Sequence, residues 1–309
     1  MPFSHPNPAV GAILWRDGRV IGHGWTQPGG RPHAEAMALA AAGDARGATL
    51  YVTLEPCAHA SARGPACADL VVAAGVARVI IGVEDPDPRT AGAGLARLRA
   101  AGIAVELLAL PEAAASLAGY LMRARAARPF VTLKLALSID GCIALADGSS
   151  RWITGETARA HGHALRARHD AILVGGGTLR ADAPRLDVRL AGLETRRPAR
   201  LVLTRGTAPP GWTALADPSE IARLDAQYLM IEGGAGAAAA FLAADLVDRL
   251  VVYRAPIVIG GGLVGVGDLG LGDLGAAHGR WRAIDHRRLG EDALDVYDRD
   301  PCSPASSPR

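Results

Sequence analysis

A histidine, a glutamate and two cysteines stand close together near the start of the chain. His33 and Glu35 lie in PHAEAMALAAAG, and Cys57 and Cys67 follow in LEPCAHASARGPACADL. Imidazole and thiolate are ligands that zinc prefers, and a catalytic zinc keeps three protein ligands and one position for water. The metal acidifies that water, and a nearby carboxylate can carry the proton. The residue types therefore predict zinc ligands at His33, Cys57 and Cys67, with Glu35 as the acid–base group.

The predicted ligands stand where helices are expected to begin. His33 precedes an alanine-rich run that is typical of a helix up to Gly43, and Cys67 opens the helical pattern ACADLVVAAG. The free N–H groups at a helix N-terminus favour a thiolate. Positions i and i+2 do not share a helix face. His33 and Glu35 can therefore converge only at the end of a helix.

The order of the four residues is more informative than any one of them. An isolated H-x-E is more typical of a surface helix, and a lone cysteine of a small core residue. Together they match the zinc-deaminase signature H-x-E…P-C-x-x-C, except that nine residues separate the cysteines. A structural zinc module is the non-enzymatic alternative. Such a closed site prefers four protein ligands and has no use for Glu35.

The composition excludes several classes of protein. The formal charge of +2 does not favour a nucleic-acid or membrane partner. No apolar run reaches the ~20 residues that a bilayer span needs, and the first residues do not resemble a signal peptide. Four cysteines in 309 residues are too few for a disulfide scaffold. The simplest expectation is a cytoplasmic protein with free thiols.

Strand-like and helix-like segments alternate in both halves of the chain, which indicates an α/β architecture. The length suits two domains, and Arg128-Pro129 marks a break. We expect domains at residues 1–127 and 128–300, followed by a disordered tail at residues 301–309. The segment that begins at Pro111 is expected to form one helix.

Five motifs point to one family. HPNPAVGAI, HAEAMAL, YVTLEPCAH, GPACADL and DPDPRTAGAGL together resemble the bifunctional riboflavin-biosynthesis deaminase/reductase family, and the resemblance covers nearly the whole chain. It implies an N-terminal cytidine-deaminase-like three-layer domain followed by a dihydrofolate-reductase-like α/β domain. It also implies zinc-dependent deamination of a diamino-ribosylamino-pyrimidinone phosphate, then NADPH-dependent reduction of the ribosyl group to ribityl. The implied partner is a small molecule, and the family forms homo-oligomers.

In the first half the resemblance extends to the substrate. Asn7 matches the family's base-binding asparagine, and His59 stands where the family has a substrate-side histidine. His59 is also an alternative metal ligand, although Cys67 completes the softer ligand set that zinc prefers. Asp87 replaces a frequent asparagine. The helix that usually precedes HPNP is not found, so either the domain lacks one covering helix or the start is misassigned.

In the second half KLALSIDG, SRWITG, DAILVGGGTLRAD and MIEGG resemble the family's reductase domain. The glycine clusters lack the G-x-G-x-x-G fingerprint, but glycines between a strand and a helix can cradle a phosphate. By position, the implied cofactor-binding residues are Trp152, Thr178, Asp182, Gly233 and Gly234. The implied substrate-binding residues are Ser150, Arg166, Leu186, Arg189 and Glu232.

Residues 201–232 are short for this family, and the stretch TAPPGWTALADPSEIARLDAQ between two expected strands is expected to fold only as loop and one short helix. Two alternatives follow. In one, the chain is a deaminase whose reductase domain is impaired by the short segment. In the other, it is a stand-alone base or nucleoside deaminase with an unrelated second domain, which the SRWITG, TLRAD and IEGG series argues against.

Overall fold

The computed structural model describes residues 4–59 and 62–300. The chain forms two compact units, and the division falls between Arg128 and Pro129. The predicted disordered tail at residues 301–309 lies outside the described residues. No helix in the described ranges combines the length and the apolar character needed to cross a membrane.

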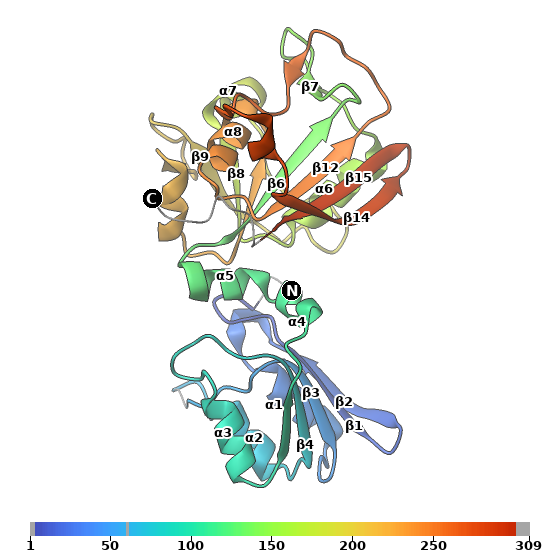
Figure 1. The fold of residues 1–309 in the computed structure, drawn as a ribbon, viewed down its shortest axis with the longest axis vertical. Helices are drawn as coiled ribbons and strands as arrows, with labels where there is room; N and C mark the ends of the chain where they lie inside the picture. The colour runs from blue at the N-terminus through green and yellow to red at the C-terminus, as the bar shows by residue number, and fades with distance from the viewer. Residues whose placement is uncertain (1–3, 60–61, 301–309) are drawn as a thin grey trace. The chain divides into compact units, whose positions relative to one another are not determined.

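The first unit is a five-stranded sheet with helices packed against it (Figure 1). Its strands run in the order β2-β1-β3-β4-β5, in which β1 is antiparallel to both neighbours and the others are parallel. The strands are β1 (Gly11–Arg16), β2 (Arg19–Trp25), β3 (Thr49–Leu54), β4 (Arg78–Val83) and β5 (Ala104–Leu107). The helices are η1 (Pro28–Gly30), α1 (Ala34–Ala42), α2 (Cys67–Ala73), α3 (Ala93–Ala100), α4 (Pro111–Ser116) and α5 (Ala118–Ala126).

Two glycines let α1 lie directly on β2. A Cβ atom at Gly22 would stand 2.4 Å from the carbonyl oxygen of Ala38, and one at Gly24 would stand 2.5 Å from that of Ala34. No real side chain tolerates such distances, so glycine alone permits this approach. Successive strand residues alternate between faces, so both glycines share the face that α1 covers. This packing sets the position of the start of α1, where His33 stands.

The segment from Pro111 forms two short helices where one was expected. The break falls at Leu117, whose side chain is buried in the core. Ala113 of α4 packs against Gly82 of β4, since a Cβ atom at Gly82 would lie 2.6 Å from the Cβ of Ala113. Gly82 alternates with the core residues Ile81 and Val83, so α4 covers the sheet face opposite to the one those residues face.

The second unit is built on an eight-stranded sheet with the order β10-β9-β8-β11-β6-β12-β15-β14 (Figure 1). The first six strands in this order are parallel, and β15 and β14 are antiparallel additions. The strands are β6 (Phe130–Leu137), β7 (Cys142–Ala144), β8 (Ala171–Gly175), β9 (Ala199–Leu203), β10 (Thr213–Leu215), β11 (Tyr228–Glu232), β12 (Arg249–Arg254), β13 (Leu263–Val264), β14 (Trp281–Leu289) and β15 (Asp292–Arg299). The helices are α6 (Glu156–Arg166), α7 (Gly176–Asp182), η2 (Pro218–Arg223), α8 (Ala235–Ala243) and η3 (Leu274–Ala277).

The segment at residues 207–227 contains one more strand than expected. It forms the edge strand β10, which pairs in parallel with β9, and the 3-10 helix η2. Leu215 and Ile221 are buried in the core of the second unit, so their burial holds the segment against the sheet. The expectation of loop and one short helix was therefore wrong. The parallel sheet therefore ends in β10 on this side.

Candidate active sites

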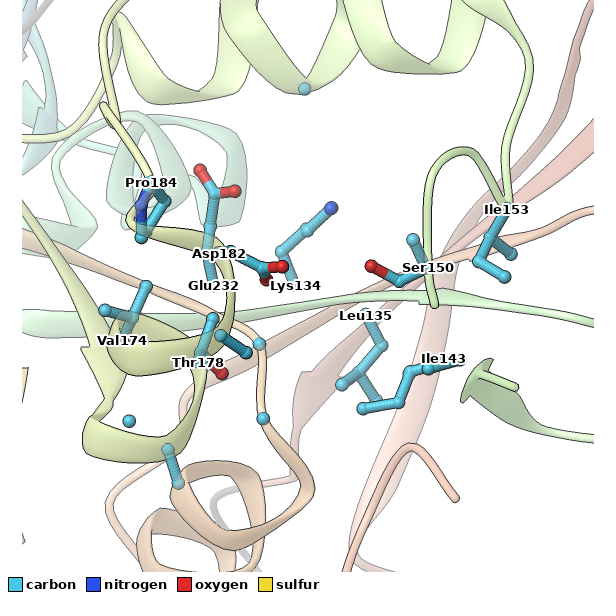
Figure 2. Close-up of a pocket in the computed structure, with 18 of the residues that line it drawn as sticks. Lys134, Leu135, Ile143, Ser150, Ile153, Val174, Thr178, Asp182, Pro184 and Glu232 are labelled. Atoms are coloured by element: carbon cyan, nitrogen blue, oxygen red, sulfur yellow. The ribbon is translucent and has the colours of Figure 1, made fainter. Parts of the chain in front are cut away.

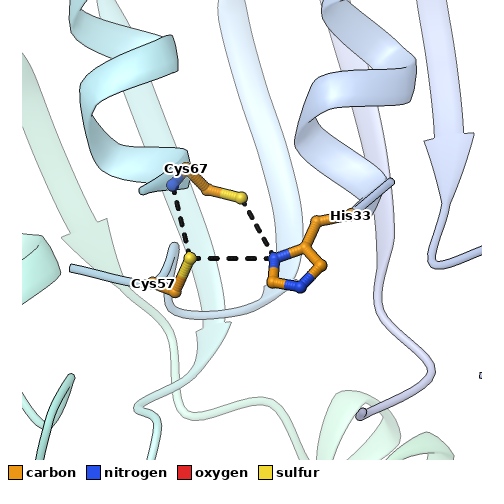
Figure 3. Close-up of side chains that lie close together, drawn as sticks. All are labelled: His33, Cys57 and Cys67. Atoms are coloured by element: carbon orange, nitrogen blue, oxygen red, sulfur yellow. Dashed lines mark hydrogen bonds between the residues drawn. The ribbon is translucent and has the colours of Figure 1, made fainter. Parts of the chain in front are cut away.

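The three predicted metal ligands, His33, Cys57 and Cys67, come together in the first unit (Figure 3). Nδ1 of His33 lies 3.3 Å from Sγ of Cys67 and 3.7 Å from Sγ of Cys57. The candidate ligand atoms all lie within 4.8 Å of one another. A single ion can contact all three atoms at this spacing.

Local structure explains why these side chains converge. His33 is the N-cap of α1, and Cys67 is the first residue of α2. Cys57 follows β3, and its Sγ accepts a hydrogen bond from the backbone N–H of Cys67 at 3.3 Å. Two helix N-termini and one strand end therefore meet at one point. Their N–H groups favour negative charge on the sulfurs.

The two thiols have pKa values shifted in opposite directions. The hydrogen bond with Cys67 lowers the pKa of the Cys57 thiol to about 4. The same contact with the Cys57 sulfur, together with burial, raises the pKa of the Cys67 thiol. A divalent metal between the sulfurs would replace the thiol proton of Cys67 and hold both as thiolates. Two thiolates and an imidazole are a soft donor set that fits zinc.

Glu35 stands beside this cluster and is almost fully buried. Burial raises the pKa of its carboxyl to about 7. A carboxyl group with a pKa near neutrality can both take up and release a proton. Glu35 is in the first turn of α1, and His33 is the N-cap of the same helix. The two side chains therefore converge at the end of the helix, as their i, i+2 spacing predicted.

Asn7 contacts the metal cluster, whereas His59 does not join it. Nδ2 of Asn7 lies 2.9 Å from Nε2 of His33 and donates to the carbonyl oxygen of Gly30 at 3.1 Å. His59 contacts Thr90 instead, with 3.3 Å between its Nδ1 and the threonine hydroxyl. Among the described residues the candidate metal group contains His33, Cys57 and Cys67 and leaves out His59.

Asp87 is neutralised by a neighbour. Its carboxylate accepts from the guanidinium of Arg89, with 2.5 Å between Oδ2 and Nη2. This contact is the main cause that lowers the pKa of Asp87. Arg89 therefore compensates the negative charge that Asp87 adds at a position where the family frequently has asparagine.

The second unit contains a cavity of about 1140 Å³ (Figure 2). It lies at the carboxyl ends of β6, β8 and β11, where ligands bind in open α/β sheets. All ten residues that the resemblance assigned to the reductase line it: Ser150, Trp152, Arg166, Thr178, Asp182, Leu186, Arg189, Glu232, Gly233 and Gly234. They come from segments more than eighty residues apart in the sequence. The tertiary structure brings the whole predicted set to one place.

The turn between β11 and α8 is shaped for close approach of a ligand. Gly233 and Gly234 have φ angles of 84° and 81°, which side chains rarely adopt. A Cβ atom at Gly234 would stand 2.7 Å from Oγ1 of Thr178. Gly234 is the N-cap of α8, whose free N–H groups attract a phosphate. The residues here fit a dinucleotide phosphate.

Comparison with known proteins assigns the two units. Residues 2–83 match the cytidine and deoxycytidylate deaminase zinc-binding region, and residues 129–294 match the RibD C-terminal domain. The riboflavin biosynthesis protein RibD of Escherichia coli K12 is 40% identical, with 83% of this chain and 84% of the relative covered. The chain belongs to the RibD family. The RibD of Aquifex aeolicus is 34% identical over 96% of this chain and 94% of its own.

Solved RibD structures share the fold of this family member. RibD of Acinetobacter baumannii, in its form 1, has a TM-score of 0.86 at 33% identity, with 96% of this chain and 94% of the other covered. A deaminase/reductase from Thermotoga maritima has a TM-score of 0.84 at 30% identity, with 96% and 93% covered. The predicted cytidine-deaminase-like domain and dihydrofolate-reductase-like domain are therefore confirmed.

Membership of the RibD family confirms the predicted deaminase and reductase activities. The chain is a bifunctional riboflavin-biosynthesis enzyme, with a zinc-binding deaminase domain and a reductase domain of the type that uses NADPH. The alternative of a deaminase with an impaired reductase is not supported, because the relatives match nearly the full length. A second domain of unrelated function is excluded by the match to residues 129–294.

Arg166 and Glu232 form a buried pair in the RibD reductase cavity. The Nε and Nη2 atoms of Arg166 donate to the two oxygens of Glu232, the second at 2.8 Å. Burial opposes both charges, but the pairing outweighs it, so the pKa of Arg166 is raised and that of Glu232 is lowered. Each residue holds the other in its charged state.

Lys134 lines the same cavity and was missed from the sequence. Figure 2 shows its side chain extending from β6 into the open space. Its Nζ lies 5.7 Å from the centre of the Tyr253 ring, and it makes no hydrogen bond or ion pair with any residue that the structure describes. Burial lowers the pKa of this amine. The sequence does carry a signal for this residue, which is a lysine inside the apolar strand FVTLKLAL. Lysine is almost never fully buried unless it is paired, so a lysine at such a position indicates a function.

Proposed function

We propose that the two sites act in sequence on one pyrimidine. The first site would deaminate 2,5-diamino-6-ribosylamino-pyrimidinone 5′-phosphate, and the second would reduce the resulting 5-amino-6-(5-phosphoribosylamino)uracil. The related Thermotoga maritima protein is named diaminohydroxyphosphoribosylaminopyrimidine deaminase/5-amino-6-(5-phosphoribosylamino)uracil reductase. The observation that carries the proposal is the convergence of His33, Cys57 and Cys67 beside the buried Glu35.

In the deaminase, His33, Cys57 and Cys67 would hold zinc. When bound, zinc supplies a water acidified toward neutral pH. Glu35 takes a proton from the attacking water and delivers a proton to the departing amino group. The oxygen of the water bonds to the ring carbon, the carbon–nitrogen bond breaks, and ammonia leaves. Asn7 borders His33, and we assign it to the pyrimidine.

In the reductase, the glycine turn before α8 and Thr178, Asp182 and Trp152 would hold NADPH. Bound NADPH would supply a hydride for C1 of the ribosyl group and would leave as NADP⁺, while the C1–O4 bond would break and O4 would take a proton. Lys134 reaches into the cavity with a lowered pKa, so we assign it as the proton donor.

Arginines on the wall of the cavity would hold the substrate phosphate. Arg166 and Arg189 both line the cavity, and a guanidinium binds phosphate oxygens in pairs. Glu232 keeps Arg166 in place. Ser150 and Leu186 border the rest of the substrate.

We further propose that the enzyme works in the cytoplasm as a homo-oligomer. The described cysteines are free thiols, which suits a reducing compartment. Five large apolar or aromatic residues of the first sheet are at least 41% exposed: Ile13, Trp15, Val20, Trp25 and Tyr51. Large exposed apolar residues support self-association. Light scattering on the purified chain would test this, and a monomer at micromolar concentration would contradict it.

A hydride-transfer assay tests the reductase half directly. The deaminated intermediate is supplied with either NADPH or NADH, and cofactor oxidation is followed by absorbance. We expect turnover with NADPH. An Arg166→Ala variant should lose affinity for the intermediate more than affinity for NADPH. Equal loss of both affinities would show that Arg166 does not hold the substrate.

A further inference from the structure

Asp187 carries a carboxylate oxygen that the described chain leaves unsatisfied. Its Oδ1 is buried and has no hydrogen-bond partner among the residues that the structure describes. Nη1 of Arg189 is 3.8 Å away, which is beyond hydrogen-bond distance. An unpaired buried acceptor destabilises a fold, so such atoms are rare and often serve a ligand.

Other contacts fix Asp187 and leave only this oxygen unused. Its carbonyl oxygen accepts from Nη1 of Arg166 at 3.0 Å and lies 3.2 Å from Nδ1 of His163. Its second carboxylate oxygen, Oδ2, pairs with Arg185 at 3.1 Å. The neighbouring Leu186 is buried and has a φ angle of 52°. The loop is therefore held by its contacts with α6 and by the burial of Leu186.

The position of Asp187 points to the reductase substrate. Asp187 lines the reductase cavity together with Arg166, Arg189 and Glu232. Both oxygens of Glu232 are occupied by Arg166. Asp187 thus offers a carboxylate oxygen that is still free to accept a hydrogen bond at this wall. An ionised carboxylate repels a phosphate but accepts readily from a neutral hydroxyl.

We propose that Oδ1 of Asp187 accepts a hydrogen bond from a ribosyl hydroxyl of the substrate. The sugar is the part of the molecule next to the phosphate that Arg166 and Arg189 would hold. The inference rests on the proposed reductase function and adds a specificity-determining residue to it. A site built to bond a hydroxyl rejects an analogue that lacks it. The enzyme therefore selects the ribosyl compound over deoxyribosyl analogues.

The test compares 5-amino-6-(5-phosphoribosylamino)uracil with its 2′-deoxyribosyl and 3′-deoxyribosyl analogues. In the wild-type protein we expect one analogue to lose about 100-fold in kcat/KM, mostly through KM. In Asp187→Leu we expect kcat/KM for the ribosyl compound to fall to the value that the wild type shows for that analogue. A variant that keeps the wild-type preference for the ribosyl compound overturns the proposal.

Two controls separate this role from a structural one. Arg185→Ala removes the exposed partner of Oδ2 and should leave the preference unchanged, because exposed ion pairs contribute little. Ligand-free Asp187→Leu should unfold at a temperature no lower than the wild type, since an unpaired acceptor has been removed. A large drop in its unfolding temperature, together with weaker NADPH binding, overturns the proposal in favour of a structural role.

Ligand-induced thermal shifts keep the test independent of turnover. The wild type should be stabilised more by the ribosyl compound than by one deoxyribosyl analogue, and Asp187→Leu should be stabilised equally by both. If the wild type shows this difference but transfers no hydride, the proposed reductase function fails and the role of Asp187 stands. Equal stabilisation of the wild type by all three compounds overturns the role of Asp187.

Discussion

The side-chain amide of Asn7 lies 2.9 Å from Nε2 of His33, on the side of the ring away from the two sulfurs. Nδ1 of the same ring contacts Cys57 and Cys67. With a metal on Nδ1, Nε2 carries the ring proton, so Asn7 supports the imidazole from behind when its amide turns Oδ1 toward Nε2 to accept from it. A support of this kind orients a metal ligand, and its loss typically costs 10–100-fold in metal affinity.

We predict that Asn7→Ala weakens zinc binding by about 10–100-fold. Competition with a chromogenic chelator measures this without any substrate. Gln27→Ala, a change nearby on an exposed contact, serves as the control. Unchanged zinc affinity together with a raised KM for deamination would show that Asn7 contacts only the pyrimidine.

Glu35→Gln should retain zinc and lose deamination by about 100-fold or more, as expected when an acid–base group is removed. Glutamine preserves the shape of the buried side chain but cannot carry the proton. Metal analysis and an ammonia-release assay give the two readouts. Hydride transfer from NADPH should be unchanged in this variant. Full deaminase activity in Glu35→Gln would refute the assigned role.

Gly24→Ala should disturb the metal site from a distance. The new methyl group would stand 2.5 Å from the carbonyl oxygen of Ala34, so α1 must shift. Overpacking of this kind destabilises a protein by roughly 1–3 kcal/mol, and here the shift also moves His33. Gly11→Ala is the matched control, because its nearest neighbour would be 3.9 Å away. Calorimetry and zinc titration should separate the two variants.

Glu232→Ala should destabilise the second unit by about 3–5 kcal/mol, because it leaves the buried charge of Arg166 without a partner. The double variant Arg166→Met with Glu232→Leu removes both charges and should recover most of that loss. Thermal unfolding of the three proteins measures the effect. If the double variant is as unstable as Glu232→Ala, packing rather than charge sets the stability here.

His169 should make the second unit less stable in acid. Burial lowers the pKa of this histidine to about 4, below its ordinary 6.5. Between these values the unfolded chain binds a proton that the folded chain does not, so stability falls as the pH drops from 6.5 to 4. The shift corresponds to about 3 kcal/mol.

The pH effect is isolated by comparison with His169→Gln. The wild-type free energy of unfolding should fall more steeply than that of the variant between pH 6.5 and pH 4. Glutamine keeps polar atoms near the carbonyl oxygen of Leu165 and the hydroxyl of Thr132, which the histidine contacts. Parallel curves for the two proteins would mean that His169 takes up its proton at the same pH in the folded and the unfolded chain.

The metal cluster and the glycine turn before α8 were predictable because each depends on local chemistry. His33, Cys57 and Cys67 were recognisable by residue type and order, and Gly233 and Gly234 by their place between a strand and a helix. The break at Leu117 was not predictable, since it depends on a buried contact rather than on helix propensity. The strand β10 was also missed, because its three residues are held by pairing with β9 and by core burial, and neither leaves a periodic pattern.

The sequence alone determined which chemistry the chain can perform, because ligand type, acid–base groups and glycine turns are properties of residues and their order. The ten residues that the family's motifs assign to the reductase all line one cavity. Only the tertiary structure decided that Lys134 extends into the cavity, that Asn7 borders His33, and that Oδ1 of Asp187 has no hydrogen-bond partner among the described residues. These are relationships between segments distant in the chain, and they depend on how parallel strand ends meet and on which polar atoms remain unpaired after packing.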